Sequence, residues 1–306
     1  MRVLTLPAFA KINLTLRVLG VRHDGYHAVR TVLQSLALHD TLTVRAARGA
    51  FRIECDDPGC PTDRTNLVWH AADLVWLAAG RADRPRDVVV HIAKRIPLQA
   101  GLGGGSSDAA AAIRALVALW RLDLPREQLH SIAASLGADV PFFLEGGTAL
   151  GLDRGDLVFP LIDQPAAWVT LALPPFGVST REAYGWFDED ELSTSSVRRV
   201  LSGPPRPGSG GPRPRFDGWS LPAAEWGNDL ELPVARRHAE ITAMTGHLRK
   251  VGAFHAAMSG SGSAVFGLFR AAAAAKTAAK ALSGHSRRVL VTRALDHAAC
   301  RRLAAK

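Results

Sequence analysis

The residues with the clearest chemical implication lie between positions 101 and 108, which read Gly-Leu-Gly-Gly-Gly-Ser-Ser-Asp and run directly into an alanine-rich segment. Glycine lets the backbone approach a ligand closely, because it has no Cβ atom. The first amides of a helix have no partner within the helix and carry partial positive charge. A glycine-rich turn that leads into a helix therefore predicts a phosphate-binding loop.

This loop differs from the two commonest phosphate-binding motifs. A P-loop has a lysine after its last glycine, and none follows here, whereas a dinucleotide-binding fingerprint has a glycine where Ser106 stands. A flexible linker is disfavoured, because a strand-like run at 88–92 precedes the loop and a strong helix-forming run follows it. We expect Ser106 and Ser107 to cap that helix and Asp108 to lie in its first turn.

A second glycine run lies far away in the sequence. Positions 259–263 read Ser-Gly-Ser-Gly-Ser and precede the apolar run 264–269. By itself this pattern predicts only a tight turn between a helix and a strand. Taken together with the first run, it favours two backbone segments that close around one phosphorylated ligand.

The composition is that of a folded enzyme with one large or two ordinary domains, since 47% of the 306 residues are hydrophobic and 21% are charged. Three cysteines form no even disulfide framework and indicate a reducing compartment, and Cys55 and Cys60 lack a second Cys/His pair at zinc spacing. The first residues lack the apolar core of a signal peptide, and no apolar run is long enough to span a membrane. We therefore expect a cytoplasmic protein with no membrane partner and no structural metal site.

The net charge of +9 raises the question of nucleic-acid binding. The basic residues are spread along the chain, and the most basic stretch, 206–215, is rich in proline and glycine. No helix-turn-helix, RNA-recognition or zinc-finger pattern is present in the sequence. The charge is better explained by attraction for an anionic small molecule than by a nucleic-acid partner, and a basic non-catalytic binding protein remains the alternative.

The elements that must position the two glycine runs follow from hydrophobic periodicity. Polar and apolar residues alternate at 11–18, with Lys11 and Asn13 on one face, which predicts a half-buried strand. Two strands with a break near His39 and Asp40 are expected in 31–44. Further strands are expected at 88–92, 147–151, 167–173, 263–269 and 288–293. Helices are expected at 66–79, 107–120, 125–136, 180–187, 190–201, 230–250 and 271–282, and a Pro/Gly-rich loop insertion at 202–218.

Six motifs stand in a consistent order along the chain: Ala8-Phe9-Ala10-Lys11-Ile12-Asn13-Leu14, Arg22-His23-Asp24-Gly25-Tyr26-His27, Pro97 to Ser107, Leu136-Gly137-Ala138-Asp139-Val140-Pro141-Phe142, Gly227-Asn228-Asp229-Leu230-Glu231 and Ser259 to Gly262. Together they resemble the galactokinase, homoserine kinase, mevalonate kinase and phosphomevalonate kinase (GHMP) superfamily. The resemblance implies an α+β fold with a ribosomal S5 domain 2-like N-terminal half, 1–155, and a ferredoxin-like C-terminal half, 156–306.

The same resemblance implies an ATP-dependent kinase that phosphorylates an alcohol group of a small molecule. Asp139 is then the general base, and Lys11 is the cation beside it. ATP, expected to arrive with Mg²⁺, would bind at Pro97, Leu98, Gln99, Ala100, Gly101, Leu102, Gly103, Gly104, Gly105, Ser106 and Ser107.

The Asp-Gly-Tyr-His motif, which the sister kinases lack, resembles the motif of one branch of the superfamily. That branch phosphorylates the tertiary 2-hydroxyl of a diphosphocytidyl methylerythritol in non-mevalonate isoprenoid biosynthesis. Asn13 is then a substrate contact, Tyr26 stacks on cytosine and His27 reads the edge of the base. Tyr184 is the first candidate for the opposite aromatic face and Trp186 the second. A sister kinase acting on homoserine or a mevalonate-type substrate remains the alternative, and a monomer or homodimer is expected.

Overall fold

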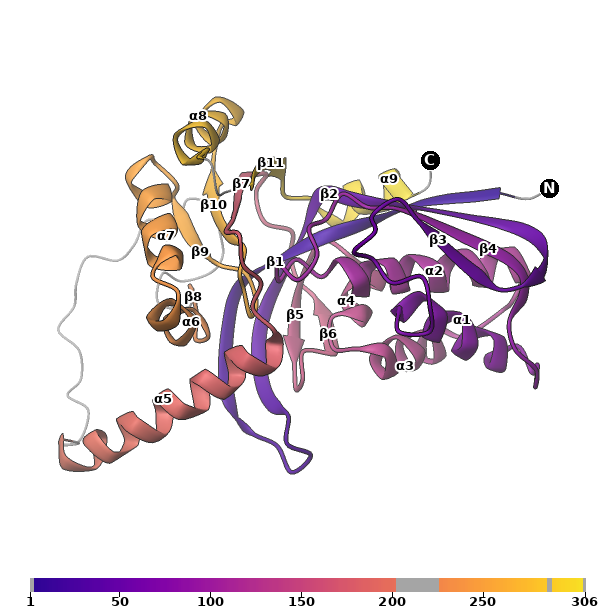
Figure 1. Cartoon of the computed structure of the whole chain (residues 1–306), viewed down its shortest axis with the longest axis horizontal. Helices are drawn as coiled ribbons and strands as arrows, with labels where there is room; N and C mark the ends of the chain where they lie inside the picture. Colours follow the sequence, from indigo (N-terminus) through magenta and orange to yellow (C-terminus); the bar gives the residue numbers. More distant parts are fainter. Residues whose placement is uncertain (1–2, 202–225, 285–287, 305–306) are drawn as a thin grey trace.

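Two β-sheets packed face to face organise the chain, and helices cover their outer faces (Figure 1). The structure is a computed structural model that describes residues 3–201, 226–284 and 288–304, except for the side chains of 192–201. The loop insertion expected at 202–218 lies outside the described residues.

The N-terminal sheet is built on a hairpin of two long antiparallel strands, β1 (Val3–Val21) and β2 (His27–Ala50). The strand order is β3-β4-β2-β1-β8, with β5 paired to β2 and β6 paired to β5. The added strands are β3 (Arg52–Cys55), β4 (Arg86–Ala93), β5 (Thr148–Leu152), β6 (Leu157–Pro160) and β8 (Gly227–Asn228). Helices pack on one face of this sheet, and they are α1 (Leu67–Ala78), α2 (Gly104–Trp120), α3 (Arg126–Leu136) and α4 (Val140–Glu145).

The C-terminal sheet is antiparallel and has the strand order β11-β7-β10-β9. Its strands are β7 (Trp168–Leu173), β9 (His255–Met258), β10 (Val265–Phe269) and β11 (Arg288–Arg293). The remaining helices are α5 (Thr180–Leu201), α6 (Glu231–Arg237), α7 (Glu240–Lys250), α8 (Ala272–Leu282) and α9 (His297–Ala304). This order is that of a ferredoxin-like sheet, with α7 and α8 on its outer face, and it confirms the α+β prediction. Helix α9 returns to the N-terminal sheet and contacts β1.

The face between the two sheets explains the alternation in β1. Ile12 and Leu14 point into an apolar cluster shared with Val169 and Phe266 of the C-terminal sheet. The opposite face carries Lys11, which is only 4% exposed. The prediction of a half-buried strand is therefore wrong, because both faces of β1 are covered at this point. A polar face that is buried must find partners, and those partners define the site below.

Three predicted boundaries are wrong for physical reasons that lie outside the local pattern. Strand β2 runs through His39 and Asp40 without a break, because β1 pairs with it on both sides of a bulge. The two helices expected between 180 and 201 are the single helix α5, whereas the helix expected at 230–250 is divided into α6 and α7 at His238. Strand β1 begins at Val3, eight residues before the predicted start at 11. The other predicted strands and helices are present within a few residues of their expected ends.

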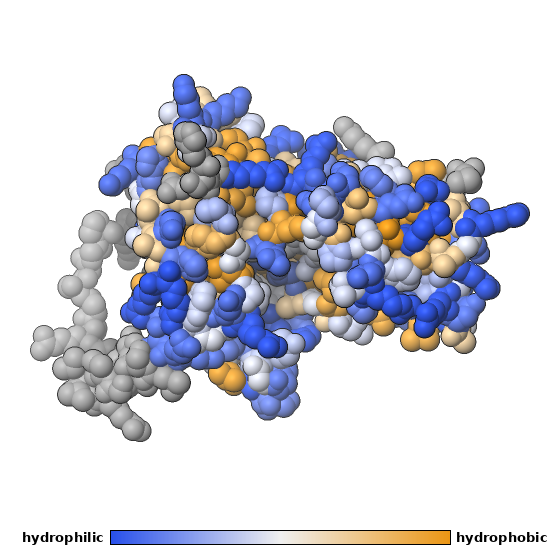
Figure 2. Space-filling model, viewed as in Figure 1, coloured by the Kyte–Doolittle hydropathy of each residue, from blue (hydrophilic) through white to orange (hydrophobic). Residues whose placement is uncertain are grey.

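The visible surface is mixed in character. Hydrophilic side chains cover most of the face shown in Figure 2, and the hydrophobic ones lie between them in small groups. Among the helices that the structure describes, none combines the length and the apolar character needed to cross a bilayer.

Candidate active site

A lysine and an aspartate meet on the buried polar face of β1. Lys11 Nζ lies 3.2 Å from Asp139 Oδ2, and the exposed fraction of the two side chains is 4% and 36%. Asp139 directly precedes α4, and its side chain does not cap that helix, so the carboxylate is free to pair with Lys11. The result is a buried ammonium that holds a carboxylate within reach of a bound molecule.

A chain of hydrogen bonds fixes the orientation of Asn13 beside this pair. Lys11 Nζ donates to Asn13 Oδ1 at 2.7 Å, and Asn13 Nδ2 donates to Thr31 Oγ1 at 2.7 Å. Thr31 Oγ1 in turn donates to the carbonyl oxygen of Thr15. Each group thus has a defined donor or acceptor role, so the lysine ammonium is aimed by a network and not only by its own rotamer. The sequence reasoning did not identify Thr31, which is a common strand residue with no local signal.

The first glycine run packs directly on Lys11. The amide of Lys11 donates to the carbonyl oxygen of Leu102 at 3.0 Å, and a Cβ atom on Gly103 would lie 3.1 Å from Lys11 Cγ. Gly103 has a φ of 73°, a left-handed conformation that favours glycine, and it is the N-cap of α2. No described side chain caps this helix, so its first amides remain available to a ligand.

The prediction that Ser106 and Ser107 cap the helix is therefore wrong. Helix α2 begins earlier, at Gly104, because Gly103 in its left-handed conformation turns the chain where a serine was expected to do so. Asp108 lies beyond the first turn and is buried, with 2% of its surface exposed. The serines are thus part of the helix, and the glycines themselves form its start.

The second glycine run meets the first one at the same place. Ser259 Oγ donates to the carbonyl oxygen of Gly101 at 3.0 Å, and a Cβ atom on Gly260 would lie 3.3 Å from Lys11 Nζ. Asn228 Nδ2 donates to the carbonyl oxygen of Gly260 at 2.7 Å and so holds this loop. The expectation that the two runs come together is confirmed. The role of Asn228 was not predicted, although it lies in one of the six motifs.

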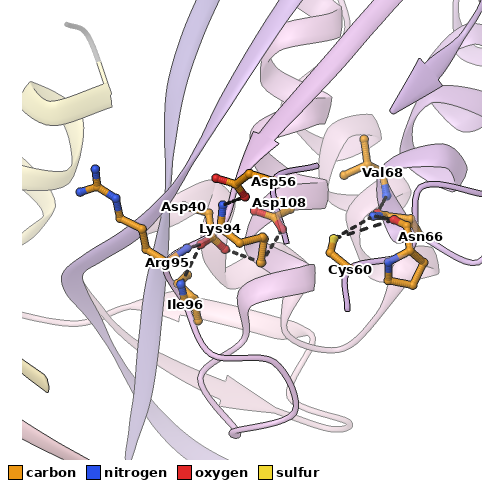
Figure 3. A network of polar contacts seen from close by, with 10 residues as sticks. Asp40, Asp56, Cys60, Asn66, Val68, Lys94, Arg95, Ile96 and Asp108 are labelled. Atoms are coloured by element: carbon orange, nitrogen blue, oxygen red, sulfur yellow. Dashed lines mark hydrogen bonds and ion pairs between the residues drawn. The ribbon is translucent and has the colours of Figure 1, made fainter. Parts of the chain in front are cut away.

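A buried ionic network connects the N-terminal part of α2 to the N-terminal sheet (Figure 3). Lys94 Nζ lies 2.5 Å from Asp40 Oδ2 and 2.9 Å from Asp108 Oδ2, and all three side chains are at most 3% exposed. Asp40 Oδ1 also accepts from the amides of Arg95 and Ile96. The network joins β2, the end of β4 and α2, so it fixes the glycine run relative to the sheet. No local pattern predicts it, because its members are far apart in the sequence.

The charges in this network do not balance. Two carboxylates share one ammonium, and Asp108 Oδ1 has no hydrogen-bond partner among the described residues. Burial raises the pKa of Asp108 to about 7, and the negative charge of Asp40 adds to this effect while Lys94 opposes it. Burial by itself would lower the pKa of Lys94, but the carboxylates of Asp108 and Asp40 raise it above its ordinary value. Lys94 therefore stays charged, and the additional proton that this network binds as pH falls is held by a carboxylate.

This imbalance predicts a pH-dependent contribution to stability. The folded chain binds the Asp108 proton below a pH of about 7, whereas the unfolded chain binds it only below its ordinary pKa of 3.8. The folded state thus holds more protons between these values, and the free energy of unfolding falls as pH rises through that window. We expect Asp108→Asn, measured against wild type by urea unfolding, to gain about 2–3 kcal/mol in relative stability between pH 5 and pH 8.

The control for this measurement is Asp73→Asn, since Asp73 is 33% exposed and pairs with Arg64 on the surface. Its stability difference from wild type should not change between pH 5 and pH 8. A difference for Asp108→Asn that is equally constant would contradict the raised pKa of Asp108.

A second group of side chains lies where the β1–β2 hairpin meets α5. His27 stacks on Tyr184 with ring centroids 4.6 Å apart, and its Nε2 lies 2.8 Å from Asp188 Oδ1. Tyr26, which is 60% exposed, lies beneath the guanidinium of Arg154 at 5.7 Å. The structure therefore brings His27 and Tyr184 together and leaves the Tyr26 ring open to solvent.

Tyr184 is also influenced by the charge of the first group. Burial raises the pKa of Tyr184 above its ordinary value, and the negative charge of Asp139 raises it further. Trp186, the second candidate for the aromatic role, contacts His238 and Arg237 and not His27.

The fold and the glycine runs define the class of protein. Family models of the GHMP kinases N terminal domain and the GHMP kinases C terminal match residues 66–147 and 220–286. A crystal structure of mevalonate kinase aligns over 97% of this chain and all of that one with a TM-score of 0.63 at 12% identity, which shows a common fold. The chain is a GHMP kinase.

More similar proteins narrow the class. The 4-diphosphocytidyl-2-C-methyl-D-erythritol kinase of Moorella thermoacetica is 40% identical over 96% of this chain and 100% of that protein, and that of Gloeobacter violaceus is 39% identical over 93% and 91%. A crystal structure of 4-(cytidine 5'-diphospho)-2C-methyl-D-erythritol kinase aligns over 95% of this chain and 99% of that one, with a TM-score of 0.73 and 33% identity. The chain belongs to the 4-diphosphocytidyl-2-C-methyl-D-erythritol kinase family.

Proposed function

We propose that this protein transfers the γ-phosphate of ATP to the tertiary 2-hydroxyl of 4-diphosphocytidyl-2-C-methyl-D-erythritol, a step in isoprenoid precursor biosynthesis. The observation that carries the proposal is the Lys11–Asp139 pair, 3.2 Å apart, with both glycine runs packed beside it. Phosphoryl transfer depends mainly on positioning and on charge stabilisation, and these residue types supply both.

In the proposed mechanism, Asp139 accepts the proton of the substrate hydroxyl as the oxygen attacks the γ-phosphorus, and the bond between the γ-phosphorus and the bridging oxygen of ADP breaks. Lys11 offsets negative charge that develops on the transferred group. Asn13, fixed through Thr31, is the neighbouring contact for the substrate.

ATP is proposed to bind along 97–107, with its phosphates at the amides that begin α2. The left-handed Gly103 and the uncapped helix start support this assignment. Mg²⁺ is expected to accompany the nucleotide, and it needs only one or two protein oxygens when phosphates and water supply the rest. The described residues contain no cluster of three acidic, histidine or cysteine side chains that could hold a metal ion by themselves.

The cytidine of the substrate is proposed to bind at the second group, with Tyr26 stacked on the base and His27 at its edge. The basic character of the chain suits two phosphorylated substrates. We infer a reducing cytoplasm as the compartment, which the free thiols of Cys55, Cys60 and Cys300 support.

The proposed reaction is tested by ADP release with three acceptors. The diphosphocytidyl substrate should support turnover, whereas homoserine and mevalonate should not. Turnover with homoserine or mevalonate, and none with the diphosphocytidyl substrate, would assign a sister reaction. Absence of ADP release with all three would contradict a kinase.

Removal of the Tyr26 ring is expected to weaken cytidine binding selectively. Tyr26→Ala loses one stacking face, which is worth about 1–3 kcal/mol, or roughly a 5- to 150-fold loss of affinity. Titration calorimetry with CDP measures this loss, and ATP affinity should change little. Tyr26→Phe keeps the ring and should keep the affinity, and Phe159→Ala, which removes a ring that is 51% exposed on β6, serves as the control. Unchanged CDP binding in Tyr26→Ala would remove this residue from the pocket.

A further inference from the structure

Three residues on one face of α5 contact the ring of His27. Tyr184 stacks on it with an angle of 26° between the rings, and Phe187 contacts it edge-on at 6.4 Å. Asp188 Oδ1 lies 2.8 Å from its Nε2. These three residues are spaced i, i+3 and i+4 and so share one face of the helix. The His27 side chain is only 10% exposed, so its orientation is fixed by these contacts.

The two ring nitrogens of His27 have different surroundings. Of the described residues, Asp188 is the only one that bonds to the ring, and it does so at Nε2. A carboxylate can only accept a hydrogen bond, so Nε2 must carry the proton. In a neutral imidazole the other nitrogen is then an acceptor. When the ring is neutral, Asp188 thus leaves Nδ1 with a free lone pair.

Neighbouring acids on the same turn have other partners. Glu189 Oε2 lies 2.6 Å from Arg237 Nη2, and Asp190 Oδ2 lies 2.8 Å from Arg236 Nη1. Both of those contacts join α5 to α6. In this acidic turn, Asp188 is the carboxylate that contacts the hairpin.

We propose that Asp188 sets the base specificity of the enzyme by fixing His27 in the Nε2–H tautomer, so that Nδ1 accepts a hydrogen bond from the 4-amino group of cytosine. The inference rests on the proposed function, which brings a cytidine diphosphate to His27. Uracil carries an oxygen acceptor at the same ring position. Two acceptors face to face repel each other, and the site would then reject uridine because its polar edge is left unpaired.

Asp188 acts in this scheme through His27 and is a positioning residue. Its test must therefore separate a change of tautomer from a general loss of structure. Asp188→Asn has nearly the same shape, but its amide can either donate to Nε2 or accept from it. Asp188→Lys places an ammonium there, which can only donate and so moves the ring proton to Nδ1. Glu189→Gln is the matched control, since it removes an adjacent charge that faces Arg237.

The experiment is a calorimetric titration of the full chain with CDP and with UDP at pH 8. Wild type should prefer CDP. The CDP-to-UDP preference should fall about 3- to 10-fold in Asp188→Asn, as for one lost hydrogen bond, and further in Asp188→Lys. The ¹⁵N shifts of the His27 ring should report a protonated Nε2 in wild type and a protonated Nδ1 in Asp188→Lys. Unchanged ATP affinity in both variants would show that the fold is retained.

The outcomes separate the inference from the function on which it rests. The role of Asp188 would be overturned if both Asp188 variants kept the CDP-to-UDP preference of wild type, or if Nδ1 of His27 were protonated in wild type. Either result would leave the cytosine pocket intact. An equal loss of the CDP-to-UDP preference in Glu189→Gln would also overturn the role of Asp188. The effect would then come from the net charge of α5 and not from the tautomer of His27. Equal binding of CDP and UDP by wild type would overturn the pocket itself and the role of Asp188 with it.

Discussion

Asp139→Asn is expected to bind both substrates and to lose most of its turnover. The amide keeps the shape of the carboxylate, but it cannot accept the proton of the substrate hydroxyl. A positioned general base contributes about 10²–10⁴-fold, so kcat should fall by that range. Steady-state ADP release gives kcat, and titration with ATP and with CDP gives the two affinities, which should stay within a few-fold of wild type.

The matched control is again Asp73→Asn, because Asp73 has a similar exposed fraction and pairs with Arg64 at 3.3 Å. Its kcat should not change. Lys11→Ala tests the other half of the pair, and the double variant should lose little more than the worse single variant, because the two groups act as a unit. Near-normal turnover in Asp139→Asn would remove the assignment of the base.

The placement of the candidate site residues was largely predictable from the sequence, whereas their burial was not. The glycine runs and the alternation in β1 are local signals, and they placed Lys11 and Asn13 on one face. Local alternation cannot tell whether a second layer covers that face. Here the loop at Ser259, nearly 250 residues away, and Asp139 cover it, so a strand that reads as half-buried is buried on both sides.

The missed residues share a different property: each is ordinary in its own neighbourhood. Asp188 stands in the acidic run 188–191, which reads as a solvated helix face. Asp40 lies within β2, at the point where the sequence predicted a break between two strands. Only the tertiary contacts with His27 and with Lys94 give these carboxylates a role. The order of the six motifs predicted the family correctly, because a family resemblance carries the long-range arrangement that single elements lack.

A side chain at Gly105 is expected to block ATP while leaving the protein folded. A Cβ atom at this position of α2 would meet no protein atom within 4 Å, so the space beside it is open to a ligand. Gly105→Val should fold as wild type does, but its branched side chain would stand where a phosphate approaches the helix start. Overpacking of this kind costs about 1–3 kcal/mol, or roughly a 5- to 150-fold loss of ATP affinity.

The choice of position decides what this experiment can report. A Cβ atom on Gly101 would lie 2.3 Å from the carbonyl oxygen of Ser259, and one on Gly104 would lie 3.1 Å from the Ile96 side chain, so those variants would test folding as much as binding. Gly246→Val is the matched control, since Gly246 also lies in a helix, α7, with open space around it. Both valine variants should unfold at similar urea concentrations, and only Gly105→Val should lose ATP. Equal ATP affinity in the two variants would mean that the nucleotide phosphates bind somewhere other than the start of α2.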